Sequence, residues 1–158
     1  MAASASSDTN QYLCFTLSAE TYAFRIPYVR EVAFIRSITP LPSPLDFVAG
    51  VINLRGSVIP VIDLRKKFSL DAAPLADERT ILIIERVYDE GTRLIGAIVD
   101  GVCGVTVFPE LEICESPGIG LRIDPEFVQG IATKDDRTVV ILNAGRLFER
   151  GAFEAAGE

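Results

Sequence analysis

One segment of the chain is repeated 80 residues further on. The stretch FVAGVINLRGSVIPVIDLRKKF, at residues 47–68, aligns without a gap with FVQGIATKDDRTVVILNAGRLF, at residues 127–148. Identical residues fall at four pairs of positions: Phe47 and Phe127, Val48 and Val128, Gly50 and Gly130, and Phe68 and Phe148. Apolar residues also agree along the second predicted strand of the segment, and Asp63 aligns with Asn143. We infer two similar β-units, one in each half of the chain.

Short apolar runs of five to eight residues, separated by Gly, Pro and Asp, dominate the sequence. Alternation with a period of two is typical of strands, and it places Leu13, Phe15 and Leu17 on one face of the first run. A hairpin is expected around Arg55-Gly56, because glycine supplies the positive φ that a tight turn needs. Further strands are predicted at residues 22–26, 29–35, 51–54, 58–64, 81–87, 94–99 and 102–108. The sequence therefore predicts an all-β fold.

Two segments depart from this strand pattern. Three prolines, Pro40, Pro42 and Pro44, predict an extended connector that cannot be a central strand. Within it, a short helix is predicted to begin at Ser43 as N-cap and to end at Gly50 as a left-handed cap. Asp124-Pro125-Glu126 repeats the same start signal in the second half.

Each half of the 158-residue chain has a length that suits a five-stranded barrel, roughly 70 to 80 residues. A barrel of that size is marginally stable alone, so we expect the two barrels to share one hydrophobic core. The linker between them is predicted at Ser69–Asp77.

Composition and hydropathy argue against two classes of protein. The net charge of −7 opposes nucleic-acid binding, which needs clustered Lys and Arg in excess. The one basic run, Arg65-Lys66-Lys67, is interpreted as a solvated helical turn. No apolar run approaches the roughly 18 to 20 residues of a membrane-spanning helix.

The residues for catalysis or metal binding are also missing. The chain has no histidine, so Ser-His and Cys-His nucleophile pairs are impossible, and no CxxC pair is present for zinc. The three cysteines, Cys14, Cys103 and Cys114, are expected to be buried, reduced thiols. Acidic pairs at 89–90 and 135–136 are interpreted as turn residues. We therefore expect no enzyme activity, no metal and no cofactor; a small β-barrel enzyme or ligand-binding protein remains a distant alternative.

The motif Asn53-Leu54-Arg55-Gly56 is the main candidate for a binding function. An arginine held on a rigid turn loses little entropy when it grips a carboxylate or a helix terminus of a partner. The alternative is an ordinary solvated turn arginine, and position alone does not separate the two.

From Gly50 to Phe68, the stretch GVINLRGSVIPVIDLRKKF resembles the CheW family pattern of glycine, NLRG, proline and DLR. Further resemblance lies in QYLCFTL at residues 11–17, Glu31-Val32, LIGAIVDGVCGV at residues 94–105, and FVQGIA followed by VVILN. The resemblance implies two intertwined five-stranded SH3-like β-barrels around a common hydrophobic core, with a few short helices.

We accordingly expect one CheW-like domain at residues 11–150. Its subdomains are placed at about 28–78 and 79–143, with the N-terminal strands and the C-terminal helix crossing between them. Residues 1–10 are predicted to be a disordered arm without a secretory signal, and residues 151–158 a tail.

The resemblance also implies a function. Members of the family have no catalytic activity; they bridge the cytoplasmic tip of a methyl-accepting chemoreceptor to the CheW-like regulatory domain of the kinase CheA. The expected location is the cytoplasm, at membrane-associated receptor arrays, without direct membrane insertion. The alternative is an adaptor of a non-flagellar chemosensory pathway that controls pili, development or a second messenger.

Site residues are carried over motif by motif. The arginine of NLRG faces the receptor in the family and corresponds to Arg55. Glu31, Gly50 and Val105 are candidates for the same surface, whereas Val29 and Val32 can equally belong to the core. The remaining motif residues are assigned to the turn and its structural support: Asn53, Gly56, Asp63 and Arg65. The replacement of Asp63 by Asn143 in the second half is expected to change local hydrogen bonds but not the fold.

Overall fold

The secondary structure consists of short strands and single helical turns, as the alternating pattern predicts. The structure, a computed structural model, describes residues 10–70, 78–115, 123–134 and 136–149. The elements are β1 (Gln11–Leu17), β2 (Glu20–Arg25), η1 (Ile26–Tyr28), β3 (Val29–Ile35), β4 (Val48–Leu54), β5 (Ser57–Asp63), α2 (Leu64–Lys67), β6 (Arg79–Tyr88), β7 (Gly91–Val99), β8 (Gly101–Val107), η2 (Glu110–Glu112), β9 (Ile113–Cys114), η3 (Pro125–Phe127), β10 (Val128–Lys134), β11 (Arg137–Leu142) and α3 (Ala144–Leu147). The all-β prediction is confirmed.

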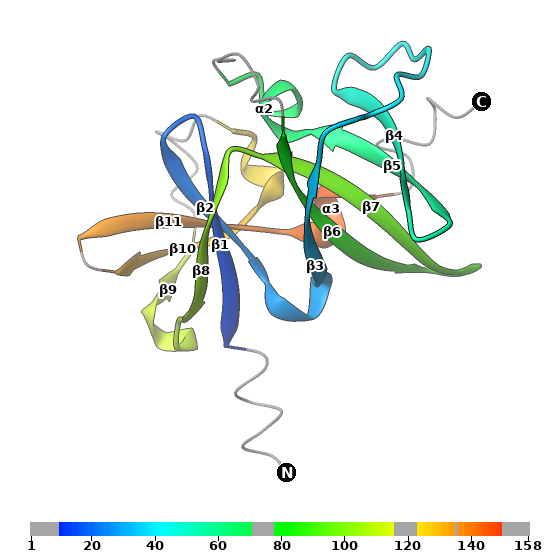
Figure 1. Ribbon diagram of the computed structural model, residues 1–158. Helices are drawn as coiled ribbons and strands as arrows, with labels where there is room; N and C mark the ends of the chain where they lie inside the picture. The colour runs from blue at the N-terminus through cyan, green and yellow to red at the C-terminus, as the bar shows by residue number, and fades with distance from the viewer. Residues whose placement is uncertain (1–9, 71–77, 116–122, 135, 150–158) are drawn as a thin grey trace.

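The strands form two sheets (Figure 1). A five-stranded sheet has the order β3-β6-β7-β5-β4, and a six-stranded sheet has the order β8-β1-β2-β11-β10-β9. Five strands were expected in each, so the second sheet has one more, the two-residue strand β9. The β4–β5 hairpin and the β10–β11 hairpin occupy equivalent places, and α2 and α3 follow them. The internal repeat in the sequence is thus a repeat of structure.

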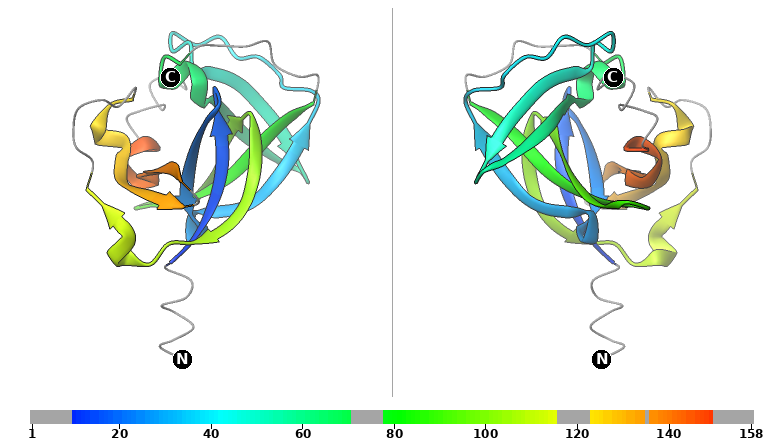
Figure 2. Two further views of the ribbon diagram at one scale, coloured as in Figure 1. Left: turned by 90° about the vertical axis from the view of Figure 1, so that its left-hand side faces the viewer. Right: turned by 90° about the vertical axis from the view of Figure 1, so that its right-hand side faces the viewer.

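The first and last strands of the chain lie in the same sheet. The N-terminal strands, blue in Figure 2, lie in the sheet that contains the orange β11. β2 pairs in parallel with β11, so that Thr21 lies beside Val139. In the other sheet β5 pairs in parallel with β7, where Val61 lies beside Gly96. The N-terminal hairpin therefore completes the sheet that the C-terminal half builds. The subdomain boundaries near residues 28, 78 and 143 stay a prediction.

The central core lies between the two sheets and receives side chains from both halves. On β1, Leu13, Phe15 and Leu17 face this core, as expected, and all three are buried. The equivalent residues Phe68 and Phe148 both lie in it, directly after α2 and α3. Smaller apolar clusters fill each barrel. Each repeated segment thus contributes its last residue, a phenylalanine, to one shared core.

Lys67 lies between the two halves at their repeated phenylalanines. Its ammonium group is 4.2 Å from the centre of the Phe47 ring and 5.2 Å from that of Phe127. Burial lowers the pKa of Lys67, and the charge of Glu126 opposes that shift. The position equivalent to Lys67 is occupied by Leu147, which is fully buried. The two halves are therefore not symmetric at this contact.

The helix predicted between Ser43 and Gly50 is wrong. Ser43 Oγ instead accepts a hydrogen bond from the Leu45 N–H at 3.0 Å, and β4 already begins at Val48. The reason is the density of prolines, which hold φ and restrict the residue before them to extended conformations. In the second half Asp124 does cap a helical turn, η3, through the Glu126 N–H at 2.9 Å.

Two further expectations about side chains are corrected. Cys14 is buried, but Cys103 and Cys114 are exposed, because they lie on the edge strands β8 and β9. Arg65, predicted to be solvated, is only 4% exposed, and its Nη1 is 3.5 Å from Asp100 Oδ1. The short helix α2 contacts β7, which turns this arginine inward. Asp63 caps α2 by accepting from the N–H groups of Arg65 and Lys66, whereas Asn143 caps α3 by accepting from the N–H of Arg146, the equivalent of Lys66.

Several expectations lie outside the described residues. These are residues 1–9 of the predicted arm, the tail at 151–158, residues 71–77 of the linker, and Asp135 of the second acidic pair. Within the described part of the chain, no helix has the length and apolar character to cross a membrane.

The turn between β1 and β2 uses residues that are poorly suited to it. Ser18 and Ala19 have φ values of +49° and +71°, which side chains disfavour and glycine accepts. We expect Ala19→Gly to raise the free energy of unfolding by about 0.5–1 kcal/mol in urea titrations. Ala19→Val, with a branched side chain at the same position, is expected to lower it. A decrease for Ala19→Gly would contradict the assignment of strain to this turn.

Candidate partner-binding site

Arg55 lies on a tight turn between β4 and β5. Arg55 and Gly56 have φ values of +51° and +88°, the combination of a type I′ hairpin turn. The Asn53 side-chain oxygen accepts a hydrogen bond from the Gly56 N–H at 3.1 Å. The turn is therefore held by its own residues, and Arg55 extends from a defined position.

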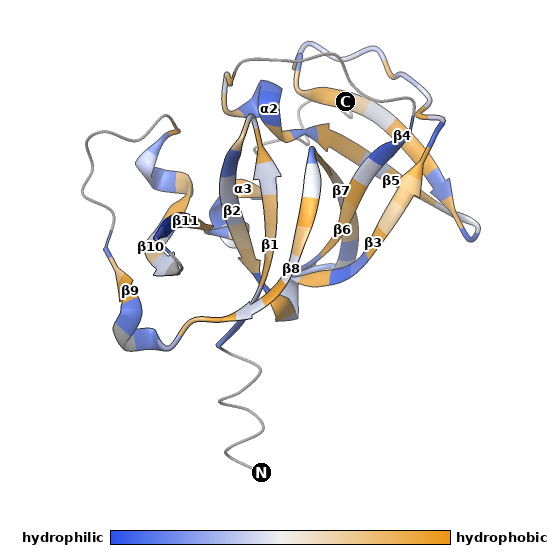
Figure 3. Ribbon diagram, turned by 60° about the vertical axis from the view of Figure 1, so that its left-hand side comes forward, coloured by the Kyte–Doolittle hydropathy of each residue, from blue (hydrophilic) through white to orange (hydrophobic). Residues whose placement is uncertain are grey.

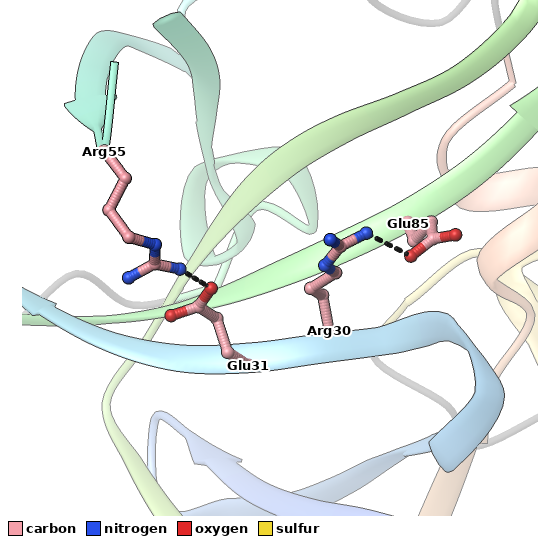
Figure 4. Close-up of polar contacts among 4 residues, drawn as sticks. All are labelled: Arg30, Glu31, Arg55 and Glu85. Atoms are coloured by element: carbon pink, nitrogen blue, oxygen red, sulfur yellow. Dashed lines mark hydrogen bonds and ion pairs between the residues drawn. The ribbon is translucent and has the colours of Figure 1, made fainter. Parts of the chain in front are cut away.

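The guanidinium of Arg55 forms an ion pair with a residue of a different strand. Its Nη2 contacts Oε2 of Glu31 on β3, and Figure 4 shows the two side chains reaching toward each other. The side chain of Arg55 is 68% exposed and that of Glu31 is 31% exposed. Beside them Arg30 Nη1 lies 3.0 Å from Glu85 Oε1. Exposed ion pairs of this kind contribute about 0–1 kcal/mol to stability. A charged group of a binding partner can therefore replace either member of the pair.

Apolar side chains gather on the edges of the two sheets. On β3, Val29 and Val32 lie opposite Ile84 and Leu82, two members of the central core. They are partly buried and pack against that core. Phe34, two residues beyond Val32, lies on the same face and is 62% exposed. The face of β3 that packs against the central core at Val29 and Val32 is therefore exposed to solvent at Phe34.

Strand β8 continues the same pattern on the other sheet. Val105 lies opposite Leu13 and Val102 opposite Phe15, both members of the central core. Opposite residues of an antiparallel pair point to the same face. Yet Val102, Val105 and Val107 are 38%, 56% and 47% exposed. Strand β8 is an edge strand, and no further strand pairs with it to cover these side chains among the described residues.

We call these residues the apolar rim: Val29, Val32 and Phe34 of β3, and Val102, Val105 and Val107 of β8. Both strands are visible from one side of the molecule (Figure 3). Exposed apolar side chains gathered on edge strands are characteristic of a protein interaction site.

The predicted site residues fall into three groups. Val29, Val32 and Val105 belong to the apolar rim. Glu31 and Arg55 meet on the opposite face of β3, since Glu31 lies opposite Ile83, which faces the interior of the first barrel. Gly50 is buried in β4, with φ +147°. A partner reaches it only past Thr39 and Pro40, which lie directly over its α-carbon.

Three residues of the rim were missed from sequence: Phe34, Val102 and Val107. The alternation of Val105 and Val107 signals one face of a strand, but it does not reveal that the strand lies at an edge. The side chain of Asn53 and the N–H of Gly56 are hydrogen-bonded across the turn, and Asp63 and Arg65 lie at the β5–α2 junction.

Comparison with known proteins identifies the family. A model of the CheW-like domain matches residues 11–152. The chain belongs to the CheW family. The chemotaxis protein CheW of Klebsiella aerogenes is 32% identical over 137 residues, which cover 87% of this chain and 80% of that protein. Among solved structures, the scaffolding protein TtCheW from Thermoanaerobacter tengcongensis superimposes with a TM-score of 0.79 and 37% identity, covering 89% of this chain and 88% of that one.

A third relative carries a different name. Protein PilI of Pseudomonas aeruginosa is 28% identical over 127 residues, covering 80% of this chain and 68% of that protein. The SH3-like fold class expected from the CheW resemblance is confirmed by the solved relative. The CheW family consists of non-catalytic scaffolds, and membership in it confirms that the chain is not an enzyme.

Proposed function

We propose that this CheW-family chain is a non-catalytic adaptor that couples methyl-accepting chemoreceptors to the histidine kinase CheA in bacterial chemotaxis. The observation that carries the proposal is the apolar rim, an exposed apolar surface on two edge strands, with a rigid arginine turn on the far side of β3. Coupling of this kind needs fixed geometry rather than chemistry in the adaptor, because each partner need only bias the arrangement of the other.

The receptor is proposed to bind as a helix. A receptor tip is a long helical hairpin, and an amphipathic helix places apolar side chains in a groove through residues spaced three and four apart. Val32 and Val105, on the two sides of the rim, would contact that helix. The ion pair of Arg55 and Glu31 would contact polar side chains of the receptor at the margin of the interface. Charges at the margin affect which partner binds more than they affect how tightly it binds.

The kinase is proposed to bind at the end of a barrel through its own CheW-like regulatory domain. The protein would then act in the cytoplasm, held at the membrane through receptor arrays. The strongest test combines both partners in one pull-down, with a receptor cytoplasmic fragment and the kinase regulatory domain. Retention of neither partner would remove the proposal.

A second candidate is an adaptor of a chemosensory pathway that controls pili, development or a second messenger. The similarity to protein PilI favours it. Both candidates use the same coupling geometry, so only the identity of the co-purified receptor and kinase separates them. Receptors encoded with pilus genes would favour the second candidate.

We expect Arg55→Glu to weaken co-sedimentation with a receptor fragment by about tenfold while leaving the urea midpoint unchanged. The side chain is exposed and its ion pair is weak, so folding does not depend on it. Arg137→Glu on β11, an exposed arginine of the other sheet, is the matched control and should bind normally. Normal receptor binding by Arg55→Glu would remove Arg55 from the contact.

The double variant Arg55→Glu with Glu31→Arg restores an ion pair of reversed polarity. Recovery of receptor binding would show that the pair acts as a unit that positions β3 and the turn. Continued loss would show that the positive charge at position 55 itself contacts the receptor.

A further inference from the structure

A single residue, Asp100, joins one sheet to the other. β7 ends at Val99 in the five-stranded sheet, and β8 begins at Gly101 in the six-stranded sheet. β8 carries one half of the apolar rim, and the other half lies on β3 of the five-stranded sheet. The position of β8 relative to the five-stranded sheet therefore determines how far apart the two halves of the rim lie.

Two hydrogen bonds hold Asp100 to the six-stranded sheet. Its backbone N–H donates to the carbonyl oxygen of Thr16 on β1 at 2.9 Å. Its side-chain Oδ2 accepts from the N–H of Ser18, in the β1–β2 turn, at 2.7 Å. Ser18 has a φ of +49°, a conformation that residues with side chains disfavour, so this hydrogen bond helps to keep the turn in place. The carboxylate thus fixes the end of the β1–β2 hairpin against the start of β8.

The other oxygen of the same carboxylate faces the first barrel. Oδ1 of Asp100 lies 3.5 Å from Nη1 of Arg65 on α2, the helix that follows β5. The side chain of Arg65 is 5% exposed and that of Asp100 is 30% exposed. Salt screens such a pair less than a surface pair, and the loss of one partner leaves the other charge uncompensated. One carboxylate therefore connects α2, the β1–β2 turn and the start of β8.

The internal repeat contains this arginine only once. The position equivalent to Arg65 in the second half is Gly145, and α3 forms there without an arginine. A residue that each half needed for its own folding would be expected in both halves. The contact between Arg65 and Asp100 therefore serves the arrangement of the two sheets rather than the fold of one half.

We propose that Asp100 is a positioning residue for receptor binding: it fixes β8 relative to α2 and so holds the two halves of the apolar rim at the spacing that a receptor helix needs. The proposal rests on the proposed function, which assigns the rim to the receptor. A site whose two sides are already in place loses less entropy on binding than one whose sides move independently. Asp100 acts through β8 and requires no contact of its own with the receptor.

The test measures the affinity of the full chain and of Asp100→Asn for a receptor cytoplasmic fragment. The amide keeps an oxygen that can accept from the Ser18 N–H, but it loses the charge that faces Arg65. We expect receptor binding to weaken about tenfold, while binding of the kinase regulatory domain at a barrel end stays within about twofold. Asp100→Glu keeps the charge and should recover most of the receptor affinity.

Two control variants separate positioning from loss of charge and from loss of stability. Asp89→Asn removes an exposed carboxylate of the β6–β7 turn and should bind the receptor normally. Ile141→Val shortens a fully buried side chain of β11, outside the rim, and is expected to lower the Tm. It should also bind the receptor normally, at a temperature at which both Ile141→Val and Asp100→Asn are folded.

Hydrogen exchange measures the positioning without any partner. In Asp100→Asn, the amide of Ser18 and the amides of β8 should exchange about tenfold faster, whereas those of β10 should keep their rates. Normal receptor affinity of Asp100→Asn, equal weakening of both partners, or failure of Asp100→Glu to restore binding would overturn the proposal. If the unaltered chain binds no receptor, the proposed function fails, whereas unchanged exchange in β8 overturns the role of Asp100 itself.

Discussion

Gly50→Ala is expected to lower the free energy of unfolding by about 3–5 kcal/mol, measured by urea denaturation. Two causes act together. The φ of +147° is poorly accessible to a residue with a side chain, and an added Cβ would lie 2.0 Å from the carbonyl oxygen of Thr39. That oxygen is fixed by its hydrogen bond from the Val51 N–H. The proline connector would have to leave β4 to make room.

Gly104→Ala is the matched control, because it separates backbone strain from the steric contact. Gly104 has a φ of +127°, but no atom lies within 4 Å of a Cβ added there. We expect it to cost about 1–2 kcal/mol. Equal losses in the two variants would show that Thr39 is not what excludes a side chain at position 50.

Val105→Asp is expected to weaken binding of a receptor fragment by tenfold or more. A carboxylate at the centre of an apolar contact would be desolvated without a partner, which is costly. The side chain is 56% exposed in the free protein, so the urea midpoint should change little. The measurement is co-sedimentation with the receptor fragment, quantified as an apparent Kd.

Val58→Asp provides the matched control for this effect. Val58 lies on β5, outside the apolar rim, and is 67% exposed. It should bind the receptor normally. Should Val105→Asp bind as well as the unchanged chain, the rim would lose its assignment as the receptor surface. Should Val58→Asp bind equally weakly, the loss would reflect charge alone and not the position of Val105.

Much of the fold could be predicted from the sequence, because strands and turns leave local signals. The period of two identified β1, an apolar run identified β6, and the repeat at residues 47–68 and 127–148 identified the two equivalent hairpins. Signals for short helices were less reliable. Asp124 caps a helical turn and Ser43 does not, although both precede a proline, because further prolines surround Ser43.

The residues of the site could be named, but their arrangement could not. Glu31 and Arg55 were singled out separately, and nothing in the spacing of 24 residues indicates that they touch. Arg65 gave the opposite error: in a run of three basic residues it looked solvated, whereas packing of α2 on β7 buries it. Alternation predicts on which face of a strand a residue lies. Only the order of the strands in the sheet shows whether that strand lies at an edge, where the residue stays exposed.

The parallel pairing of β2 with β11 has a consequence for how the chain is made. Thr21 is synthesised about 120 residues before its partner, Val139. At bacterial rates of about 5–20 residues per second, this delay is on the order of ten seconds. During that time Leu13 and Phe15 lack the side chains that the C-terminal half adds to the central core, including Leu142 and Phe148. The nascent chain therefore exposes apolar strands until its end is translated, and this interval is where a chaperone would act.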